Sequence, residues 1–174
     1  MAISIATRED IPALLDLINS AYRGEESKKG WTSEAHLLQG ELRTDESTLG
    51  EMMKMPTAVF LKSCNETGQV EGCVFLDKKE NRMYLGMLSV SPLLQAKGIG
   101  KLLMNAAEEY ARSVGCGFIF MRVISVRHEL VEWYERKGYY KTGQTEAFPG
   151  DGKFGVATQP LEFLILQKKI DKSS

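Results

Sequence analysis

The sequence predicts a fold of the α/β (α+β) class, and three observations carry that prediction. Apolar residues recur every three to four positions from 99 to 114, which is the spacing of a helix that packs one side against a core. An almost unbroken apolar run at 83–90 is typical of a strand covered on both faces. Helical and strand patterns alternate along the chain in the order β-α-α-β-β-β-α-β-α-β-β.

The first half of the chain predicts a well-patterned helix near its start. Thr7 is a candidate N-cap for this helix, and Asp10 stands at the capping-box position. Its apolar stripe consists of Ile11, Leu14, Leu15, Ile18 and Tyr22. The other elements predicted here are a strand at 3–6, a short helix at 33–38, a helix at 46–55 and alternating strands at 58–62 and 70–77.

The main element of the second half is the helix at 99–114. Gly115 is predicted to end it as the C-cap residue. Its core-facing stripe consists of Ile99, Leu102, Leu103, Ala106, Ala107, Tyr110, Ala111 and Val114. The remaining elements are strands at 117–123, 139–142 and 162–167 and a helix at 128–136. Gly86 interrupts the apolar run before the long helix, and a lone glycine in a buried strand marks a bulge or a close backbone approach.

The length of 174 residues and the ordinary charged and apolar fractions are typical of one globular domain. We predict that this domain spans residues 1–174. The net charge of −1 leaves no basic excess for phosphates, which predicts no nucleic-acid partner. No apolar run approaches the roughly 20 residues of a membrane span, and the first residues lack the pattern of a signal peptide. Three cysteines without C-x-x-C spacing and two isolated histidines predict reduced thiols and no metal site. We therefore expect a cytoplasmic protein without membrane contact.

A turn with two glycines follows the buried strand and leads directly into the long helix. Its pattern is Gln95-x-x-Gly98-x-Gly100, and glycines let a backbone approach a ligand closely. The N–H groups and dipole of the following helix favour an anion, so we interpret the turn as a pyrophosphate cradle. Leu103 excludes a dinucleotide fingerprint and Leu102 excludes a nucleotide P-loop, because those positions need a small residue and Ser or Thr. A turn that only joins strand to helix is the alternative.

A second motif begins just before the helix predicted at 128–136. The chain reads Arg127-x-x-Leu130-x-x-x-Tyr134-x-x-x-Gly138-Tyr139. Together the two motifs resemble the coenzyme A signatures Q/R-x-x-G-x-G/A and N-x-x-A-x-x-x-Y-x-x-x-G-F of the GNAT superfamily of N-acetyltransferases. The order of predicted elements is also the order of that family, so the resemblance covers nearly the whole chain. Arg127 and Leu130 stand where the family pattern has Asn and Ala. The hydrogen bond that the Asn side-chain amide usually makes is therefore not expected here.

The resemblance implies a GNAT fold. This fold has a central mixed, mostly antiparallel, twisted sheet of about six to seven strands with helices on both faces. It also implies a bulge at Gly86 that splays this strand from the next one and leaves a slot for acyl-coenzyme A.

The function that the resemblance implies is transfer of an acetyl group from acetyl-coenzyme A (acetyl-CoA, the cosubstrate) to a primary amine, by direct attack in a ternary complex without a metal. The backbone N–H of Leu88 would polarise the thioester carbonyl as an oxyanion hole does, and Val90 would pair with pantetheine through its N–H and C=O. The Tyr134 hydroxyl would protonate the departing thiolate. The residues expected at the cofactor are Leu88, Ser89, Val90, Gln95, Ala96, Lys97, Gly98, Ile99, Gly100, Lys101, Arg127 and Tyr134.

The acceptor, a small-molecule or peptide amine, is expected near two polar segments that carry aromatic residues. The residues expected to bind it are Trp31, Glu34, Glu146 and Phe148. An aromatic wall with a carboxylate suits a small, positively charged or amine-bearing molecule.

Two questions stay open at the level of the sequence. The general base is a carboxylate or a water relay, because Tyr84 stands where some family members carry Glu. The candidate carboxylates are Glu34, Asp45, Glu71 and Glu146. The alternative function is a non-catalytic acyl-CoA sensor or binding module, and the resemblance is compatible with a homodimer.

Overall fold

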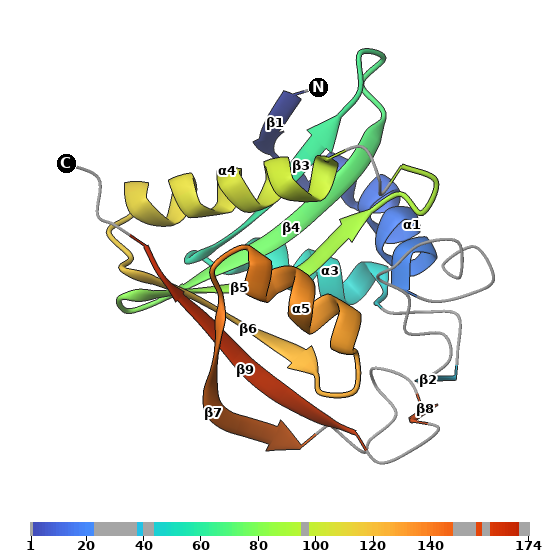
Figure 1. Cartoon of the computed structure of the whole chain (residues 1–174). Helices are drawn as coiled ribbons and strands as arrows, with labels where there is room; N and C mark the ends of the chain where they lie inside the picture. The colour runs from blue at the N-terminus through green and yellow to red at the C-terminus, as the bar shows by residue number, and fades with distance from the viewer. Residues whose placement is uncertain are drawn as a thin grey trace.

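The computed structural model describes residues 2–22, 38–39, 44–94, 98–147, 156–157 and 161–170. Its main feature is one seven-stranded sheet in the order β1-β3-β4-β5-β6-β9-β7 (Figure 1). The strands are β1 (Ala2–Ile5), β3 (Ala58–Cys64), β4 (Val70–Lys79), β5 (Arg82–Val90), β6 (Phe118–Ile124), β7 (Tyr140–Ala147) and β9 (Glu162–Lys169). All neighbouring strands pair antiparallel except β5 and β6, which are parallel. The predicted mixed, mostly antiparallel sheet is confirmed.

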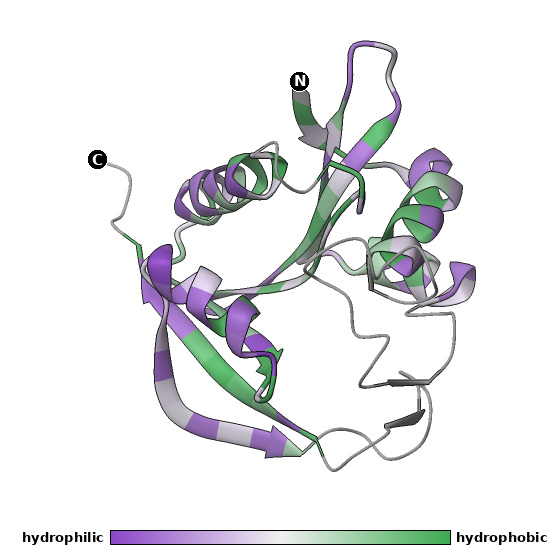
Figure 2. Cartoon of the chain, turned by 45° about the vertical axis from the view of Figure 1, so that its right-hand side comes forward, coloured by the Kyte–Doolittle hydropathy of each residue, from purple (hydrophilic) through white to green (hydrophobic). Residues whose placement is uncertain are grey.

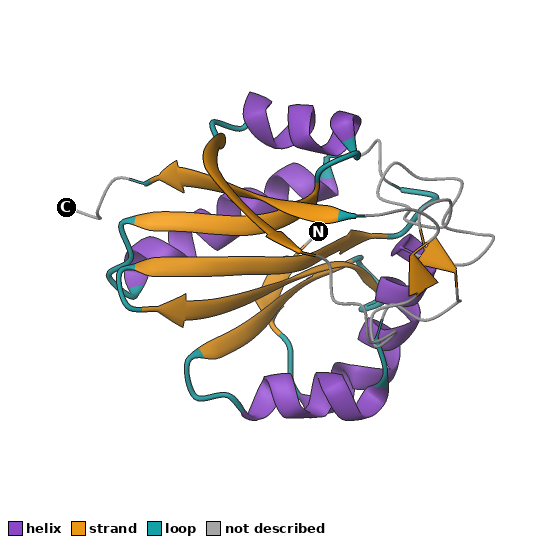
Figure 3. Ribbon diagram, turned by 90° about the horizontal axis from the view of Figure 1, so that it is seen from below, coloured by secondary structure: helices purple, strands orange, loops and turns teal. Residues whose placement is uncertain are grey.

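Helices cover both faces of the sheet, as predicted. The four α-helices of the described residues are α1 (Ile11–Tyr22), α3 (Glu46–Lys54), α4 (Ile99–Ser113) and α5 (His128–Arg136), and a short 3-10 turn, η1 (Arg8–Asp10), precedes α1. Figure 3 shows the strands between helices on either side. One core joins α1 and α3 to their face, and a second core joins α4 and α5 to the other face. Within the described ranges, no helix is long and apolar enough to cross a membrane.

The hydropathy of α4 explains its place in the fold. Figure 2 shows hydrophilic residues along one side of this helix and hydrophobic residues along the other. The buried side includes Ile99, Leu103, Met104, Ala107 and Ala111. Most of the predicted 3.6-residue stripe therefore lies on the face that packs on the sheet. Leu102 was predicted to face the core but is exposed, and Met104, which the stripe left out, is buried in its place.

Two elements differ from the sequence-based expectation. Strand β7 runs to Ala147 and not to Thr142, because most of its residues are exposed and give no apolar alternation to detect. Gly143, at φ +90°, lies where the register between β7 and β9 shifts. Leu38, at the end of the short helix predicted at 33–38, begins a strand, β2 (Leu38–Gln39), which pairs with β8 (Val156–Ala157). The rest of that predicted helix lies outside the described residues.

Helix α4 contacts both halves of the sheet. Its first turn lies close to β4, because Gly72 leaves room for the side chains of Ile99 and Leu103. Near its other end, the buried Glu108 accepts a hydrogen bond from Lys168 of β9, with a distance of 3.0 Å from Nζ to Oε1. A charged pair shielded in this way is stronger than one on the open surface.

The close approach at Gly72 yields a stability prediction. A Cβ at this position would lie 2.8 Å from Cγ2 of Ile99 and 2.9 Å from Cδ1 of Leu103. Gly72→Ala should therefore lower the free energy of unfolding by about 1–3 kcal/mol through overpacking. Gly50 of α3 is the matched control, since a Cβ there meets nothing within 4 Å. Gly50→Ala should raise stability by roughly 0.5–1 kcal/mol, because alanine favours the helix. Urea unfolding of both variants and of the parent protein measures these changes. A Gly72→Ala protein as stable as the parent would contradict the packing argument.

Candidate functional site

The candidate site begins where β5 and β6 separate. The two strands pair in parallel at only three positions, of which the last is Tyr84 opposite Phe120. Residues 85–90 of β5 and 121–124 of β6 continue as strands without pairing to each other. We call the region between these two unpaired stretches the splay. It lies in the middle of the sheet, between the part of β5 that leads to α4 and the part of β6 that leads to α5.

A bulge in β5 shapes one wall of the splay. Phe75 of β4 pairs with Gly86, and Cys73 pairs with Ser89, so β5 carries one extra residue between these pairs. The residue with left-handed backbone geometry is Met87, at φ +51°. The bulge expected at Gly86 is therefore present, but the unusual conformation falls one residue later, on a residue with a side chain.

The ladder beyond the bulge sets the direction of the backbone groups. The N–H of Ser91 donates to the carbonyl of Glu71 at 2.9 Å, which makes this a hydrogen-bonded pair. Because such pairs alternate along antiparallel strands, Val90 opposite Gly72 is a non-hydrogen-bonded pair. The N–H and C=O groups of Val90 therefore point away from β4 and toward the splay. Val90 and Leu88, which precedes it by two residues, are the residues expected to hold the thioester end of the cofactor.

The glycine turn leads into α4 beside this wall. Gly98 is the N-cap of α4 at φ +79°, a conformation that glycine adopts without strain. The first hydrogen bond of the helix runs from the N–H of Leu102 to the carbonyl of Gly98, so the earlier N–H groups of the first turn have no intrahelical acceptor. Gln95, Ala96 and Lys97, which were expected to complete the cradle, lie outside the described residues.

Gly100, which was expected to contact the cofactor, also has a packing role. A Cβ on Gly100 would lie 3.5 Å from the indole of Trp133 and 3.9 Å from Cγ2 of Val90. Its Cα therefore faces the protein interior, where it lets α5 pack against the start of α4. Of the two glycines, only Gly98 is open, since nothing described lies within 4 Å of a Cβ built there.

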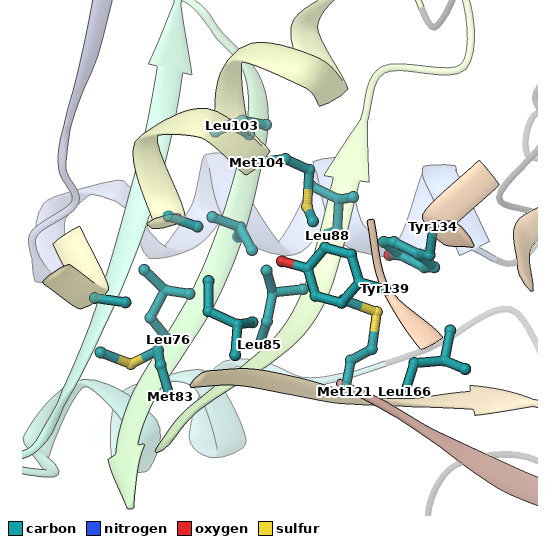
Figure 4. Close-up of a cluster of buried hydrophobic side chains, with 14 of the residues drawn as sticks. Leu76, Met83, Leu85, Leu88, Leu103, Met104, Met121, Tyr134, Tyr139 and Leu166 are labelled. Atoms are coloured by element: carbon teal, nitrogen blue, oxygen red, sulfur yellow. The ribbon is translucent and has the colours of Figure 1, made fainter. Parts of the chain in front are cut away.

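Helix α5 provides the opposite wall of the candidate site. Figure 4 shows Tyr134 reaching from α5 into the region of Leu88 and Tyr139. The Tyr134 side chain is buried, with its ring in edge contact with those of Trp133 and Tyr139. Arg127 is the N-cap of α5 and is also buried, at 7% exposure. The structure therefore brings the predicted residues of the second motif to the same side of the splay as the first turn of α4.

The opposite face of the splay carries polar and aromatic residues of β5, β6 and β7. Glu146, predicted near the acceptor, accepts a hydrogen bond from Nε of Arg122 at 2.7 Å, and both side chains are about half exposed. Arg122 in turn lies over the ring of Tyr84, 5.0 Å from its centroid. No sequence pattern indicates this cluster, because its members come from three separate strands. Trp31, Glu34 and Phe148 lie outside the described residues.

The thiol beside the splay does not supply a nucleophile. Burial raises the pKa of the Cys73 thiol to about 12, because the buried site disfavours the thiolate. The thiol therefore stays protonated at neutral pH. In the described part of the chain, no group of three metal-ligating side chains occurs. The groups that the site offers are backbone N–H donors, phenols and an arginine, which suit the binding and polarisation of a carbonyl substrate.

Curated and solved proteins share parts of this architecture. A streptothricin acetyltransferase from Streptomyces lavendulae is 32% identical over 66 residues, which is 38% of this chain and 35% of that protein. The match thus spans about a third of the length of that relative. A ribosomal-protein-alanine N-acetyltransferase from Brucella melitensis superposes with a TM-score of 0.73 at 21% identity, over 98% of this chain and 100% of that one.

A phosphinothricin acetyltransferase from Sinorhizobium meliloti, solved in complex with AcCoA, has a TM-score of 0.71 at 13% identity, over 97% of this chain and 88% of that one. At these identities the two structures establish the fold alone. The family model of the acetyltransferase (GNAT) family matches residues 12–139, a span that includes all but the first residue of α1, the splay, the cradle and α5. The chain therefore belongs to the GNAT acetyltransferase family.

Proposed function

We propose that this protein is an N-acetyltransferase that moves the acetyl group of acetyl-CoA to a primary amine by direct attack in a ternary complex. The observation that carries the proposal is the splay between β5 and β6, which has the first turn of α4 and Tyr134 on one side. Membership of the GNAT family gives this geometry its chemical meaning.

The residues of the splay fit the thioester arm of acetyl-CoA. The N–H and C=O of Val90 point toward the splay and would pair with the amide groups of the pantetheine. Gly98 and the first turn of α4 would face the pyrophosphate, together with Gln95, Ala96 and Lys97. Arg127, buried at the start of α5, adds a positive charge on the same side. Acetyl-CoA would supply the activated acyl group.

Leu88 and Tyr134 would carry out the two electrostatic tasks of the reaction. The N–H of Leu88 would donate to the thioester oxygen and stabilise the negative charge that develops there. The Tyr134 hydroxyl would give its proton to the sulfur as the C–S bond breaks, and would regain a proton from solvent. Because both groups are fixed by strand and helix, little reorganisation is needed during the reaction.

For the acceptor we propose a small, positively charged or amine-bearing molecule. Trp31, Glu34, Glu146 and Phe148 are its proposed contacts, from the segments after α1 and before β9. The likeness to a streptothricin acetyltransferase supports a small-molecule acceptor over a folded protein. We also propose a cytoplasmic location, which the three free cysteines support.

Cofactor binding is the first experiment. We expect acetyl-CoA to bind with micromolar affinity after treatment with a chelator, and ligand at about 100 times its dissociation constant to stabilise the fold by roughly 2.7 kcal/mol. Calorimetry and thermal melting measure both quantities, and thiol release over a panel of amines then tests transfer. Stabilisation by NAD or ATP but not by acetyl-CoA would overturn the proposal. Binding without thiol release from any amine would favour the non-catalytic module.

The cradle is tested by two glycines of matched conformation. Gly98 and Gly68 have φ of +79° and +84°, and a Cβ at either meets nothing described within 4 Å. Alanine at either position should therefore cost a similar strain of about 1–2 kcal/mol in stability. Only Gly98→Ala should also lose affinity for acetyl-CoA, by about tenfold or more, because Gly98 is the N-cap of α4 at the proposed cradle. Gly68 lies in the turn between β3 and β4, outside the proposed cofactor site. Equal affinities in the two variants, measured by calorimetry, would reduce Gly98 to a turn former.

Tyr134 is tested by removal of its hydroxyl alone. Tyr134→Phe keeps the ring contacts with Trp133 and Tyr139, so affinity for acetyl-CoA should barely change. The turnover number should fall by about 10²-fold, the usual range for loss of a general acid. Tyr110→Phe, toward the far end of α4, is the control and should be fully active. If Tyr134→Phe lost affinity and turnover equally, the residue would be a binding residue and not the acid.

A further inference from the structure

We propose that Tyr84 is a second catalytic tyrosine, whose hydroxyl receives the attacking amine on the face of the splay opposite to Tyr134. This inference rests on the acetyl transfer proposed above and adds the group that handles the proton of the amine. Tyr84 belongs to the core formed with α1 and α3, whereas Tyr134 belongs to the core formed with α4 and α5. The two phenols therefore lie on the two sides of the sheet, one on each side of the splay.

The Tyr84 side chain extends along β5 toward the bulge. A Cβ built on Gly86 would lie 2.9 Å from the hydroxyl oxygen of Tyr84 and 3.0 Å from its ring. The hydroxyl end of the phenol therefore lies against Gly86, where a side chain would crowd it. Its hydroxyl consequently reaches the residue just before Met87, where the β-bulge of β5 lies.

Three neighbours fix the orientation of the ring. The ring centroids of Phe75 and Phe120 lie 6.4 Å and 5.5 Å from that of Tyr84, and both contacts are inclined rather than stacked. The guanidinium of Arg122 lies 5.0 Å from the Tyr84 centroid, within the range of a cation–π interaction. Glu146 holds Arg122 in turn at 2.7 Å. A ring held by aromatic, cationic and backbone contacts has little freedom to rotate away from a substrate.

The hydroxyl of Tyr84 has no role in the described part of the fold. None of the described residues forms a hydrogen bond with it, although the ring has four separate contacts. The side chain is partly exposed, so its polar end reaches a ligand or water. By contrast, the hydroxyl of Tyr140 on β7 is satisfied by Nε2 of Gln167 at 3.1 Å. A rigidly held phenol with an unused hydroxyl beside the splay suits substrate contact better than core packing.

The proposed step balances its protons through the two phenols. The neutral amine donates an N–H to the Tyr84 oxygen, which directs its lone pair at the acyl carbon. As the C–N bond forms, the nitrogen gives this proton to Tyr84, and Tyr84 releases its own hydroxyl proton to water. The C–S bond breaks, the sulfur takes the proton of Tyr134, and Tyr134 regains one from solvent. The products are an amide and coenzyme A, and both tyrosines return to their starting form.

The test replaces Tyr84 with Phe, which keeps every ring contact and removes only the hydroxyl. With an amine that the wild-type protein acetylates, we expect turnover to fall by about 10- to 100-fold and the KM for acetyl-CoA to stay unchanged. The deficit should shrink as pH rises, because hydroxide can then accept the proton. Tyr140→Phe, three strands away in the sheet, is the control and should behave as wild type.

The outcomes separate the two proposals. If the wild-type protein transfers acetyl groups and Tyr84→Phe is equally fast, the role of Tyr84 is wrong and the proposed function stands. A deficit that stays constant with pH, or that accompanies a lower melting temperature, would make Tyr84 a structural residue and overturn this inference. If the wild-type protein acetylates no amine in the panel, both proposals fail together.

Discussion

The short parallel contact between β5 and β6 is the constraint on which the rest of this structure depends. It joins two antiparallel units, β1-β3-β4-β5 and β6-β9-β7, through three residue pairs only. Longer pairing would close the sheet and bury the edges of Leu88 and Val90 in a ladder. Shorter pairing would leave the two units without a common sheet. The cores that α4 and α5 form across both units hold them together where the backbone does not.

From this constraint follows the placement of the chemical groups. The bulge at Met87 places Leu88 and Val90 in the α4 and α5 core while Tyr84 and Met87 face α1 and α3. A strand without the extra residue would put Leu88 on the same face as Tyr84, since side chains alternate strictly along a regular strand. One inserted residue therefore separates the side of the sheet that faces Tyr134 from the side that faces Tyr84.

Much of the fold was predictable from the sequence, because local patterns determine it. The stripe of α4, the buried run of β5 and the closing glycines of the helices are signals within about 15 residues of one another. The contacts that shape the site are not local. Gly100 matches a ligand-binding pattern, yet its neighbour is Trp133 from another helix. The pairing of Arg122 with Glu146 joins two strands that are not even neighbours in the sheet, and nothing in the spacing of these residues indicates it.

Helix α4 acts as a cross-brace over the central opening of the sheet. Its first turn packs closely against Gly72 of the β1-β3-β4-β5 unit. Near its other end, Glu108 accepts a hydrogen bond from Lys168 of the β6-β9-β7 unit. Spreading the strands would strain both attachments at once, so the width of the opening is a property of the folded chain and not of its ligand. An acyl group longer than acetyl would have to find space by rearranging side chains and not by moving the strands. Selection among acyl donors would then be a matter of how those side chains pack, decided before any ligand arrives.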